Sequence, residues 1–451
     1  MGILSCSVHS VDVLVIGAGQ AGICAAYELQ KRGFTGFAGT LGADDGVTKW
    51  RKKPALGTFV VLDAEDAPGG AWQHRWPTLT MATVNHIADL PGQPIEEMDD
   101  DAPARLFVPA YFAEFEYEND LPILRPVCVY AVKNAEDETA RVDAEKTATG
   151  KDEVKEFSLL AADTPAGTRQ ESSQPGLLEA HTSAGIWRAR FIINCTGTWR
   201  HPFVPYVSGA EKFRGKQYHT QTYPGPERFW KQRVLVVGGG VSAINHVEEL
   251  AGEAKKVRWV TRTPPRWREP EHEHSLEQAR GKRQGKRGAS AGNRHSERNG
   301  GGNGSRHGES GLSPNAGRDA EERARARAEA GLPPLPVVAQ TGLLLTEHVR
   351  ELRASGILKR KPMFDSLDAD GAWWAEKHEN FDAIIWATGF RHDLGHLRPL
   401  KLRSPLGGIQ MEGVRAARDS RVYLIGYGAS ASTVGARRDA RIVAREIKQR
   451  M

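Results

Sequence analysis

Two glycine-rich turns in this chain have the residue types and spacing that bind the phosphates of a dinucleotide. The first lies in Val11–Leu29, which reads VDVLVIGAGQAGICAAYEL, and the second in Arg233–Leu250, which reads RVLVVGGGVSAINHVEEL. In each, a β-branched hydrophobic run ends in closely spaced glycines and then becomes a helical pattern. This arrangement directs backbone N–H groups and a helix N-terminus at a pyrophosphate.

Each small residue of the first turn has a separate task. Gly17 makes the tight turn, Gly19 lets the diphosphate approach the backbone, and Gly22 lets the helix pack on the strand. The second turn assigns the same three tasks, in order, to Gly238, Gly240 and Ala243.

The residue that ends the strand after each turn separates a free ribose from a phosphorylated one. A carboxylate accepts hydrogen bonds from ribose hydroxyls but repels a 2′-phosphate. Counting about 20 residues past the first glycines reaches Asp44 and Asp45, in a stretch too glycine-rich for a buried strand. Asp63 ends the β-branched run TFVVLD and is the preferred acid, so Gly36–Gly57 is interpreted as an insertion.

The corresponding strand of the second copy carries no acid. KVRWVTR ends in Thr261 and Arg262, with Arg266 and Arg268 close behind as alternative cations. An arginine suits a 2′-phosphate by its charge and by the fork geometry of its donors. The first copy is therefore predicted to bind FAD and the second NADPH.

A third signature lies just before the second turn, at Phe213–Tyr223. Phe213, Gly215, His219 and Tyr223 follow the spacing F-x-G-x-x-x-H-x-x-x-[F/Y]. This pattern resembles that of the flavin-containing and N-hydroxylating monooxygenases, the single-component class B flavoproteins. Baeyer–Villiger relatives typically end the motif in Trp, so Tyr223 favours heteroatom oxygenation. The resemblance implies that His219 is a structural hinge between domains rather than an acid–base catalyst.

Three further segments resemble parts of the same family. Pro68–Trp72, PGGAW, resembles the second flavin contact, which involves Gly70 and Trp72. Asp382–Phe390 contains the ATG-like turn that ends at Gly389, where the chain returns from the NADPH domain to the FAD domain. The family also places a C-terminal helix N-terminus near the flavin ring, which makes candidates of Gly426 and Ser432.

The chain departs from the family beside the flavin. Flavin-containing monooxygenases of animals and bacteria have an asparagine in a Y-x-x-L-x-x-N-T context, where this chain has Ala82. Asn85 lies three residues later, but a loop asparagine that hydrogen-bonds its own backbone is the preferred interpretation. An NADPH oxidase or reductase therefore remains an alternative.

Composition excludes several classes of protein. The 451 residues carry a formal charge of only +5, and much of the basic character is local to Arg280–Arg327, so we expect no nucleic-acid binding by the folded body. Four scattered cysteines without a C-x-x-C argue against a disulfide framework or a redox-active pair. His272 and His274 lack a second ligand cluster, so no metal site is expected. The N-terminal hydrophobic stretch is too short for a signal peptide or a membrane span, which predicts a cytoplasmic protein that does not enter membranes.

These features predict an α/β fold of two Rossmann-like dinucleotide-binding domains, with the NADPH domain inserted into a discontinuous FAD domain. The expected FAD parts are 1–194, with inserts at 36–57 and 134–175, and 342–451. The expected NADPH domain is 195–341, with a disordered linker at about 271–311 that lacks the hydrophobicity to offset its ordering entropy.

The resemblance implies an NADPH:O₂ oxidoreductase that oxygenates a nucleophilic N or S of a small molecule through a flavin hydroperoxide. The flavin carries that chemistry, so no protein acid or base is assigned. The alternatives are a flavin reductase or oxidase without oxygen transfer, and a nucleotide-sensing flavoprotein that turns nothing over. The sequence identifies neither the substrate nor the oligomeric state.

Overall fold

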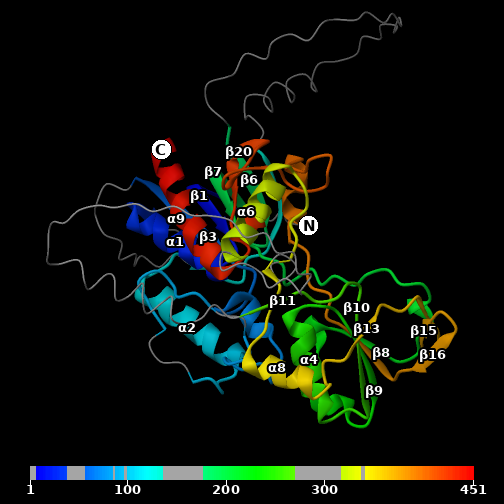
Figure 1. Ribbon diagram of the computed structural model, residues 1–451. Helices are drawn as coiled ribbons and strands as arrows, with labels where there is room; N and C mark the ends of the chain where they lie inside the picture. The colour runs from blue at the N-terminus through cyan, green and yellow to red at the C-terminus, as the bar shows by residue number, and fades with distance from the viewer. Residues whose placement is uncertain are drawn as a thin grey trace, which may run out of the picture. The chain divides into compact units, whose positions relative to one another are not determined.

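The computed structural model describes residues 7–37, 56–84, 87–95, 99–135, 176–269, 316–336 and 341–451. The chain divides into two compact units (Figure 1). Unit 1 comprises Met1–His201, Ala324–Pro334 and Phe390–Met451, and unit 2 comprises Pro202–Arg323 and Leu335–Gly389. Helix α6 (Ala316–Glu329) crosses the division between residues 323 and 324.

Unit 1 is built on a ten-stranded sheet in which the central strands run parallel. Its main path has the order β18-β19-β20-β7-β1-β3-β2, with β6 and β5 continuing beside β7, and β4 beside β3. The strands are β1 (Val8–Ile16), β2 (Phe34–Gly36), β3 (Gly57–Leu62), β4 (Ile123–Leu124), β5 (Val129–Asn134), β6 (Leu178–Thr182), β7 (Gly185–Asn194), β18 (Met411–Glu412), β19 (Arg415–Ala416) and β20 (Asp419–Leu424).

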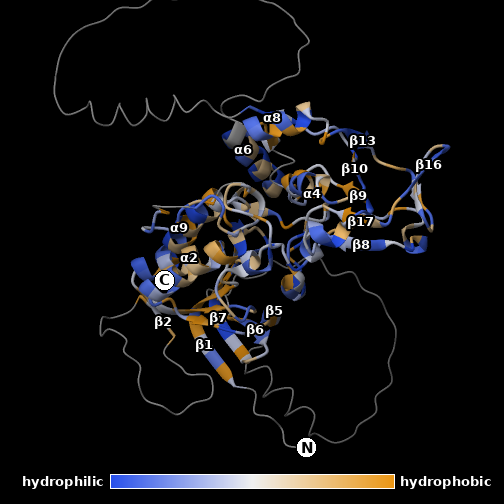
Figure 2. Ribbon diagram, turned by 90° about the horizontal axis from the view of Figure 1, so that it is seen from below, coloured by the Kyte–Doolittle hydropathy of each residue, from blue (hydrophilic) through white to orange (hydrophobic). Residues whose placement is uncertain are grey.

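The parallel register brings the carboxyl ends of four strands to one edge of this sheet. Ile16 of β1 pairs with Leu62 of β3 and Asn194 of β7, and Asn194 pairs with Leu424 of β20. Buried parallel strands read as continuous apolar runs, and β1 and β7 carry such runs at Val13–Ile16 and Phe191–Ile193; both strands include orange segments in the hydropathy view (Figure 2). The loops that follow these four strands therefore share one edge.

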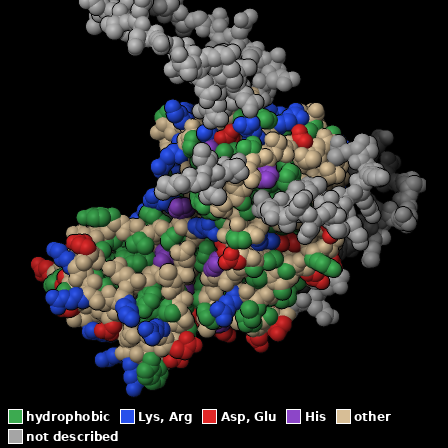
Figure 3. Space-filling model, turned by 180° about the vertical axis from the view of Figure 1, so that it is seen from behind, with side chains coloured by type: hydrophobic (Ala, Val, Ile, Leu, Met, Phe, Trp, Pro, Cys, Tyr) green, Lys and Arg blue, Asp and Glu red, His purple; other side chains and the backbone are tan. Residues whose placement is uncertain are grey.

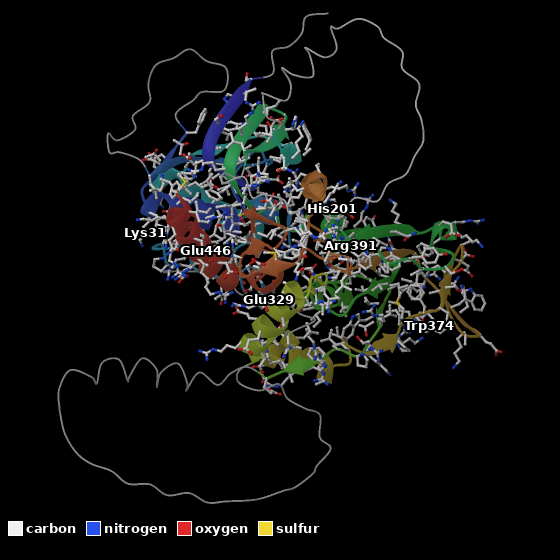
Figure 4. All side chains as sticks on the ribbon, turned by 90° about the horizontal axis from the view of Figure 1, so that it is seen from above. Lys31, His201, Glu329, Trp374, Arg391 and Glu446 are labelled. Carbon is white, nitrogen blue, oxygen red and sulfur yellow. The ribbon has the colours of Figure 1, made fainter. Side chains whose placement is uncertain are left out.

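Helices α1 (Gln20–Lys31) and α9 (Thr433–Arg450) pack side by side in unit 1. Lys31 near the end of α1 and Glu446 in α9 are labelled in Figure 4. Small buried residues along both helices allow this close approach. The remaining helical segments of the unit are α2 (Ala104–Glu118), η1 (Gly70–His74), η5 (Gly395–Leu400) and η6 (Gly428–Ser430).

Unit 2 has a parallel sheet of its own, with the order β13-β10-β9-β17-β8. A three-stranded antiparallel sheet and a two-stranded pair, β11 with β12, complete its strands. The elements are β8 (Lys216–His219), β9 (Arg233–Val237), β10 (Lys256–Thr261), β11 (Trp267–Arg268), β12 (Leu343–Leu344), β13 (Arg360–Pro362), β14 (Ser366–Leu367), β15 (Gly371–Trp374), β16 (Lys377–Asn380), β17 (Ala383–Trp386), α4 (Val241–Ala251), α8 (Glu347–Ala354), η2 (Ala210–Lys212), η3 (Thr220–Thr222) and η4 (Pro226–Phe229).

The glycine-rich stretch before Gly57 contains a strand that the sequence did not lead us to expect. Phe34–Gly36 forms β2 at the edge of the sheet, and Phe34 pairs with Gly57 and is buried. An edge strand needs pairing on one side only, so its glycine does not prevent it from forming. The following predicted segments lie outside the described residues: 38–55 of the first insert, 136–175 of the second insert, and the linker 271–311 with His272 and His274.

The division into units differs from the expected domain boundaries. The segment 342–389 lies in unit 2 rather than in the first domain, because β17 pairs with β9 and β8. Residues 324–334 lie in unit 1 rather than in the second domain, where the carbonyl oxygen of Gly331 accepts from the N–H of Gly408 at 3.0 Å. Residues 195–201 also stay with unit 1, because Cys195 N–H donates to the Ile16 carbonyl at 2.8 Å.

The molecular surface that Figure 3 shows has Lys and Arg side chains lying among acidic and hydrophobic ones. Within the described residues, no helix is both long and apolar enough to cross a membrane.

Glu379 joins the hairpin of β15 and β16 to the parallel sheet of unit 2; Trp374 of that hairpin is labelled in Figure 4. Its carboxylate lies 2.6 Å from Lys256, 2.9 Å from Arg258 and 3.2 Å from Lys361. Burial by itself would raise the pKa of Glu379, but hydrogen bonds from these three cations lower it to about 2.

Because the folded pKa of Glu379 lies below the unfolded value, its contribution to stability is present above pH 4.5 and is lost as the pH falls towards 2. We expect Glu379→Gln to lower the urea midpoint at pH 6 and to narrow the difference between the midpoints at pH 6 and pH 3. Urea titrations of both proteins at both pH values measure this. An equal pH dependence in the two proteins would contradict the role assigned to Glu379.

Candidate functional site

The first glycine turn lies where the ends of β1, β3 and β7 meet. Gly17 donates its N–H to the Leu62 carbonyl at 2.8 Å and adopts a φ of +95°, which favours glycine. A Cβ atom at Gly17 would lie 2.8 Å from the carbonyl oxygen of Cys195, and one at Gly22 would overlap the carbonyl oxygen of Gly17. Both positions therefore exclude any side chain on packing grounds alone.

Gly19 differs from these two glycines because its missing side chain faces open space. A Cβ atom there would meet no atom within 4 Å. Gly19 is also the N-cap of α1, with extended backbone and no side-chain capping bond. The N–H groups of the first helical turn are therefore available to a ligand, in contrast to those of α9, which Ser432 caps. An open, uncapped helix start beside a tight turn fits a diphosphate.

The PGGAW segment borders the same opening. A Cβ atom at Gly70 would lie 3.0 Å from the Cα of Gly19, so the two backbones pass close together. Trp72 follows in η1, and its N–H donates to the Gly69 carbonyl at 3.0 Å. The structure thus brings together two glycine segments that are about 50 residues apart in the sequence.

Asp63 follows the last residue of β3 and is only 5% exposed. Its Oδ2 accepts from Nε of Arg125 at 2.8 Å, and the remaining donors of Arg125 bind the two oxygens of Glu116 at 2.7 and 2.8 Å. Two carboxylates share one cation, which leaves a net negative charge at the end of β3. No sequence motif points to Arg125, because it lies 62 residues from Asp63 and meets it through the pairing of β3 with β4.

Gly426 and Ser432 lie on the same edge, after β20. A Cβ atom at Gly426 would meet nothing within 4 Å, so this glycine also faces open space. The hydroxyl of Ser432 accepts from the N–H of Gly435 at 3.0 Å and caps α9. Ser432 is therefore a helix cap whose side chain already accepts a hydrogen bond, whereas Gly426 faces open space.

The second glycine turn repeats this arrangement within unit 2. Gly238 donates its N–H to the Val260 carbonyl at 3.0 Å, and a Cβ atom there would overlap the carbonyl oxygen of Ala387. Gly240 is the N-cap of α4 without a side-chain capping bond, and a Cβ atom on it would face open space. Ala243 is fully buried, as expected for the helix residue that packs on the strand.

Arg262 follows β10 at the end of the second sheet and is exposed. No carboxylate pairs with it among the residues that the structure describes. Beside it, the hydroxyl of Thr261 accepts from Nε of Arg360 at 2.6 Å, which brings a second cation to this strand end. The pairing of β10 with β13 accounts for Arg360, which the sequence analysis missed.

The motif residues Phe213 and Gly215 form part of the core of unit 2. Phe213 belongs to the buried hydrophobic cluster of this unit. A Cβ atom at Gly215 would lie 2.5 Å from the Phe213 ring and from the Asp382 carbonyl oxygen. The glycine is therefore needed to seat the phenyl ring and to bring β8 against the start of β17.

His219 uses both ring nitrogens within unit 2. Nδ1 accepts from the Gln221 N–H at 3.1 Å, so the proton resides on Nε2, which donates to the Gly389 carbonyl at 3.0 Å. Burial lowers the pKa of His219 below its ordinary 6.5, which keeps the ring neutral. The histidine thus ties the motif to the turn at Gly389, an arrangement that suits a structural role rather than proton transfer.

Tyr223 ends the motif inside the same buried region. Its ring centroid lies 4.1 Å from that of His246 and 5.7 Å from that of Phe229. Burial, reinforced by Glu249, raises the pKa of Tyr223 well above its usual range. Burial also lowers the pKa of His246 to about 3, so the tyrosine and the histidine both stay neutral.

Ala82 and Asn85 are the residues that the sequence analysis placed near the flavin. Ala82 is exposed, and its N–H donates to the Asp100 carbonyl at 2.9 Å. Asn85 lies outside the described residues. Among the described residues, no group of three or more His, Cys, Asp or Glu side chains is arranged to hold a metal ion.

Comparison with known proteins gives one family model and many relatives. Residues 170–281 match the pyridine nucleotide-disulphide oxidoreductase family. The flavin-containing monooxygenase FMO GS-OX5 of Arabidopsis thaliana is 24% identical over 270 residues, which cover 57% of this chain and 50% of that protein. The chain spans about half the length of the curated relatives it matches.

Solved structures resemble nearly the whole chain. A flavin-containing monooxygenase from Stenotrophomonas maltophilia is 27% identical with a TM-score of 0.64, covering 98% of this chain and 99% of that one. Cyclohexanone monooxygenase from Rhodococcus sp. Phi1 bound to NADP⁺ is 18% identical with a TM-score of 0.56, covering 98% and 84% of the two chains, and shows likeness of fold.

The contrast between Gly19 and Gly22 generates a paired test. Gly19→Val places a side chain in open space, so we expect the protein without cofactor to unfold within a few degrees of the parent but to bind FAD at least about tenfold more weakly. Gly22→Val forces atoms into the carbonyl of Gly17, so we expect it to lower the unfolding temperature even without cofactor.

Thermal unfolding of the apoproteins and fluorescence titration with FAD measure both effects. If Gly19→Val binds FAD as the parent does, the open space at Gly19 is not the dinucleotide cradle. If the two variants lower the unfolding temperature equally, Gly19 is packed as tightly as Gly22, which would contradict the open space at Gly19.

Proposed function

We propose that this chain, a flavin-containing-monooxygenase-like protein of the class B group, is an FAD- and NADPH-dependent monooxygenase of a small molecule. The observation that carries the proposal is the pair of glycine-rich turns, one in each unit. These two cradles are Gly17–Gly22 and Gly238–Ala243. Both open at the second glycine, Gly19 and Gly240, onto an uncapped helix. The strand beside one cradle ends in an acid, Asp63, and the strand beside the other ends in a cation, Arg262.

The charge at these two strand ends supports the assignment of the nucleotides. The Asp63, Glu116 and Arg125 cluster keeps a net negative charge at the first cradle, which suits ribose hydroxyls and opposes a 2′-phosphate. Arg262 and Arg360 supply two cations at the second cradle, which suits a 2′-phosphate. FAD is therefore assigned to unit 1 and NADPH to unit 2.

Bound FAD would supply the redox chemistry, taking a hydride from NADPH and activating dioxygen. The chain's own residues bind and orient the cofactors. The backbone at Gly17, Gly19 and Gly70 holds the FAD diphosphate, and Gly238 and Gly240 hold that of NADPH. His219 fixes the turn at Gly389 while remaining neutral, so it supplies no proton.

A nucleophilic nitrogen or sulfur is the proposed site of oxygenation. Tyr223, which closes the motif where Baeyer–Villiger relatives typically have Trp, supports this choice over ketone oxidation. The Tyr223 ring itself is buried and packs against His246 and Phe229, so we assign it no contact with the substrate.

A second candidate function is an NADPH oxidase that releases peroxide. Ala82 favours it, because a methyl group offers no hydrogen bond where flavin-containing monooxygenases have an amide. The stoichiometry of the reaction separates the two candidates. A monooxygenase forms one oxygenated product for each NADPH consumed, whereas an oxidase forms peroxide instead.

We expect amines or sulfides to stimulate oxygen uptake, with product accounting for most of the NADPH consumed. Oxygen uptake, peroxide and product are measured in parallel over a panel of amines, sulfides and ketones. Peroxide equal to NADPH with every compound would support the oxidase. Turnover with ketones alone would contradict the choice of nitrogen or sulfur.

Arg262 provides a separate test of nucleotide selection. Arg262→Ala removes a charge-assisted contact with the 2′-phosphate, which is worth roughly 1.5–3 kcal/mol. We therefore expect NADPH affinity to fall by about tenfold to a hundredfold. NADH lacks that phosphate, so its affinity should hardly change.

Rates of flavin reduction over a range of NADPH and NADH concentrations measure this preference. Arg214→Ala serves as the matched control, because Arg214 is also an exposed arginine of unit 2 but lies before β8. An unchanged ratio of NADPH to NADH affinity in Arg262→Ala would exclude Arg262 as the selecting residue.

A further inference from the structure

Arg75 is a cation of unit 1 that has no role yet in the proposed FAD site. It follows η1, and its N–H donates to the Trp72 carbonyl at 3.2 Å. The centre of its guanidinium lies 5.0 Å from the ring centroid of Trp72 and 4.4 Å from that of Trp199. Both distances lie within the range of cation–π attraction. Two indole rings therefore hold this guanidinium in place.

Within the described residues, no carboxylate compensates the charge of Arg75. Its Nε is buried and has no hydrogen-bond partner there. Burial lowers the pKa of the guanidinium to about 10, and no neighbouring acid opposes this shift. Glu65 pairs instead with His74 at 2.8 Å and with Arg200 at 3.1 Å.

A buried charge without a partner destabilises a protein, so its presence calls for a compensating ligand. The cation–π contacts offset part of this cost, but they do not satisfy the buried N–H of Nε. A planar guanidinium held against indole rings directs its hydrogen bonds along its edge. Such an edge matches an acceptor with two adjacent oxygen or nitrogen atoms.

The two indoles come from the two loops that border the first glycine cradle. Trp72 lies two residues after Gly70, whose backbone packs against Gly19. Trp199 lies two residues after Gly197, at the end of the turn that packs on Gly17 through Cys195. A Cβ atom at Gly197 would meet nothing within 4 Å, so this loop also faces open space. Arg75 as a whole is partly buried, and Nε is the buried atom of its guanidinium that has no partner among the described residues.

We propose that Arg75 binds an anionic acceptor edge of FAD, with Trp72 and Trp199 fixing the plane of its guanidinium. This inference rests on the proposed function, which assigns FAD to unit 1. FAD offers two such edges: the diphosphate, and the pyrimidine edge of the flavin ring, which gains negative charge on reduction. A contact with the diphosphate strengthens binding of both redox states, whereas a contact with the ring edge strengthens binding of the reduced state.

Arg75→Met tests the proposal with readouts that do not depend on turnover. Methionine keeps an unbranched, flexible side chain and removes the unpaired charge. We expect the FAD-free variant to unfold at the same temperature as the parent or higher, and FAD to bind about tenfold to a hundredfold more weakly in at least one redox state. Arg200→Met is the matched control, because Arg200 already pairs with Glu65, and it should leave FAD affinity unchanged.

Dissociation constants for oxidised FAD, together with the two-electron midpoint potential, distinguish the two edges. Equal weakening of both states, at an unchanged potential, identifies the diphosphate. Weakening of the reduced state alone lowers the potential by about 30 mV for each tenfold change in affinity and identifies the ring edge.

Unchanged affinity and potential in Arg75→Met would overturn the proposal. A clear loss of apoprotein stability with normal FAD binding would overturn it as well, because that result describes a structural cation. These results are distinct from failure of the proposed function, in which the parent protein itself does not bind FAD.

Discussion

The structure depends on the close packing of loop backbones where parallel strands end. At Gly17, Gly22 and Gly238 the next chain segment lies so near that a Cβ atom would collide with a carbonyl oxygen. A close-packed protein interior has no empty space for such atoms. This constraint orients the start of each following helix, and it leaves Gly19 and Gly240 facing open space. Each cradle is thus one turn with a packed side and an open side.

Charge at the neighbouring strand ends distinguishes the two cradles. In unit 1 one partly buried arginine, Arg125, binds both Asp63 and Glu116 and leaves one negative charge in excess. In unit 2 the exposed Arg262 follows β10. Asp63 and Arg262 each come directly after a buried strand, so the strand fixes where the charge lies. Arg75 differs from both sets, since its charge has no partner within the described protein.

The sequence predicted the parts of this arrangement that depend on local pattern. Both glycine turns, the acid at Asp63 and the cation at Arg262 follow from short runs in which strand, turn and helix signals are adjacent. The packing of the Phe213 ring and Gly215 against Asp382 could not be predicted, because β8 and β17 lie far apart in the sequence. The same holds for Arg125, Arg360 and Trp199, because strand pairing or loop packing brings them to their sites.

Two features were misjudged for identifiable physical reasons. Glycine content suggested that the stretch after α1 lacks a strand, whereas Phe34–Gly36 pairs at a sheet edge, where one partner suffices. The expected boundary at residue 342 lies before β17, but β17 completes the sheet of unit 2, so the division falls after Gly389, at the ATG-like turn. In both cases the pairing of strands that lie far apart in the sequence decides the outcome.

One chain that holds FAD and NADPH should pass electrons from NADPH to the flavin. An anaerobic titration of the purified protein with NADPH, followed by the visible absorbance of the flavin, measures this transfer. We expect one tightly bound FAD per chain, bleached by one equivalent of NADPH and restored on admission of oxygen. A protein that binds no FAD, or whose bound FAD stays oxidised in excess NADPH, would contradict this expectation.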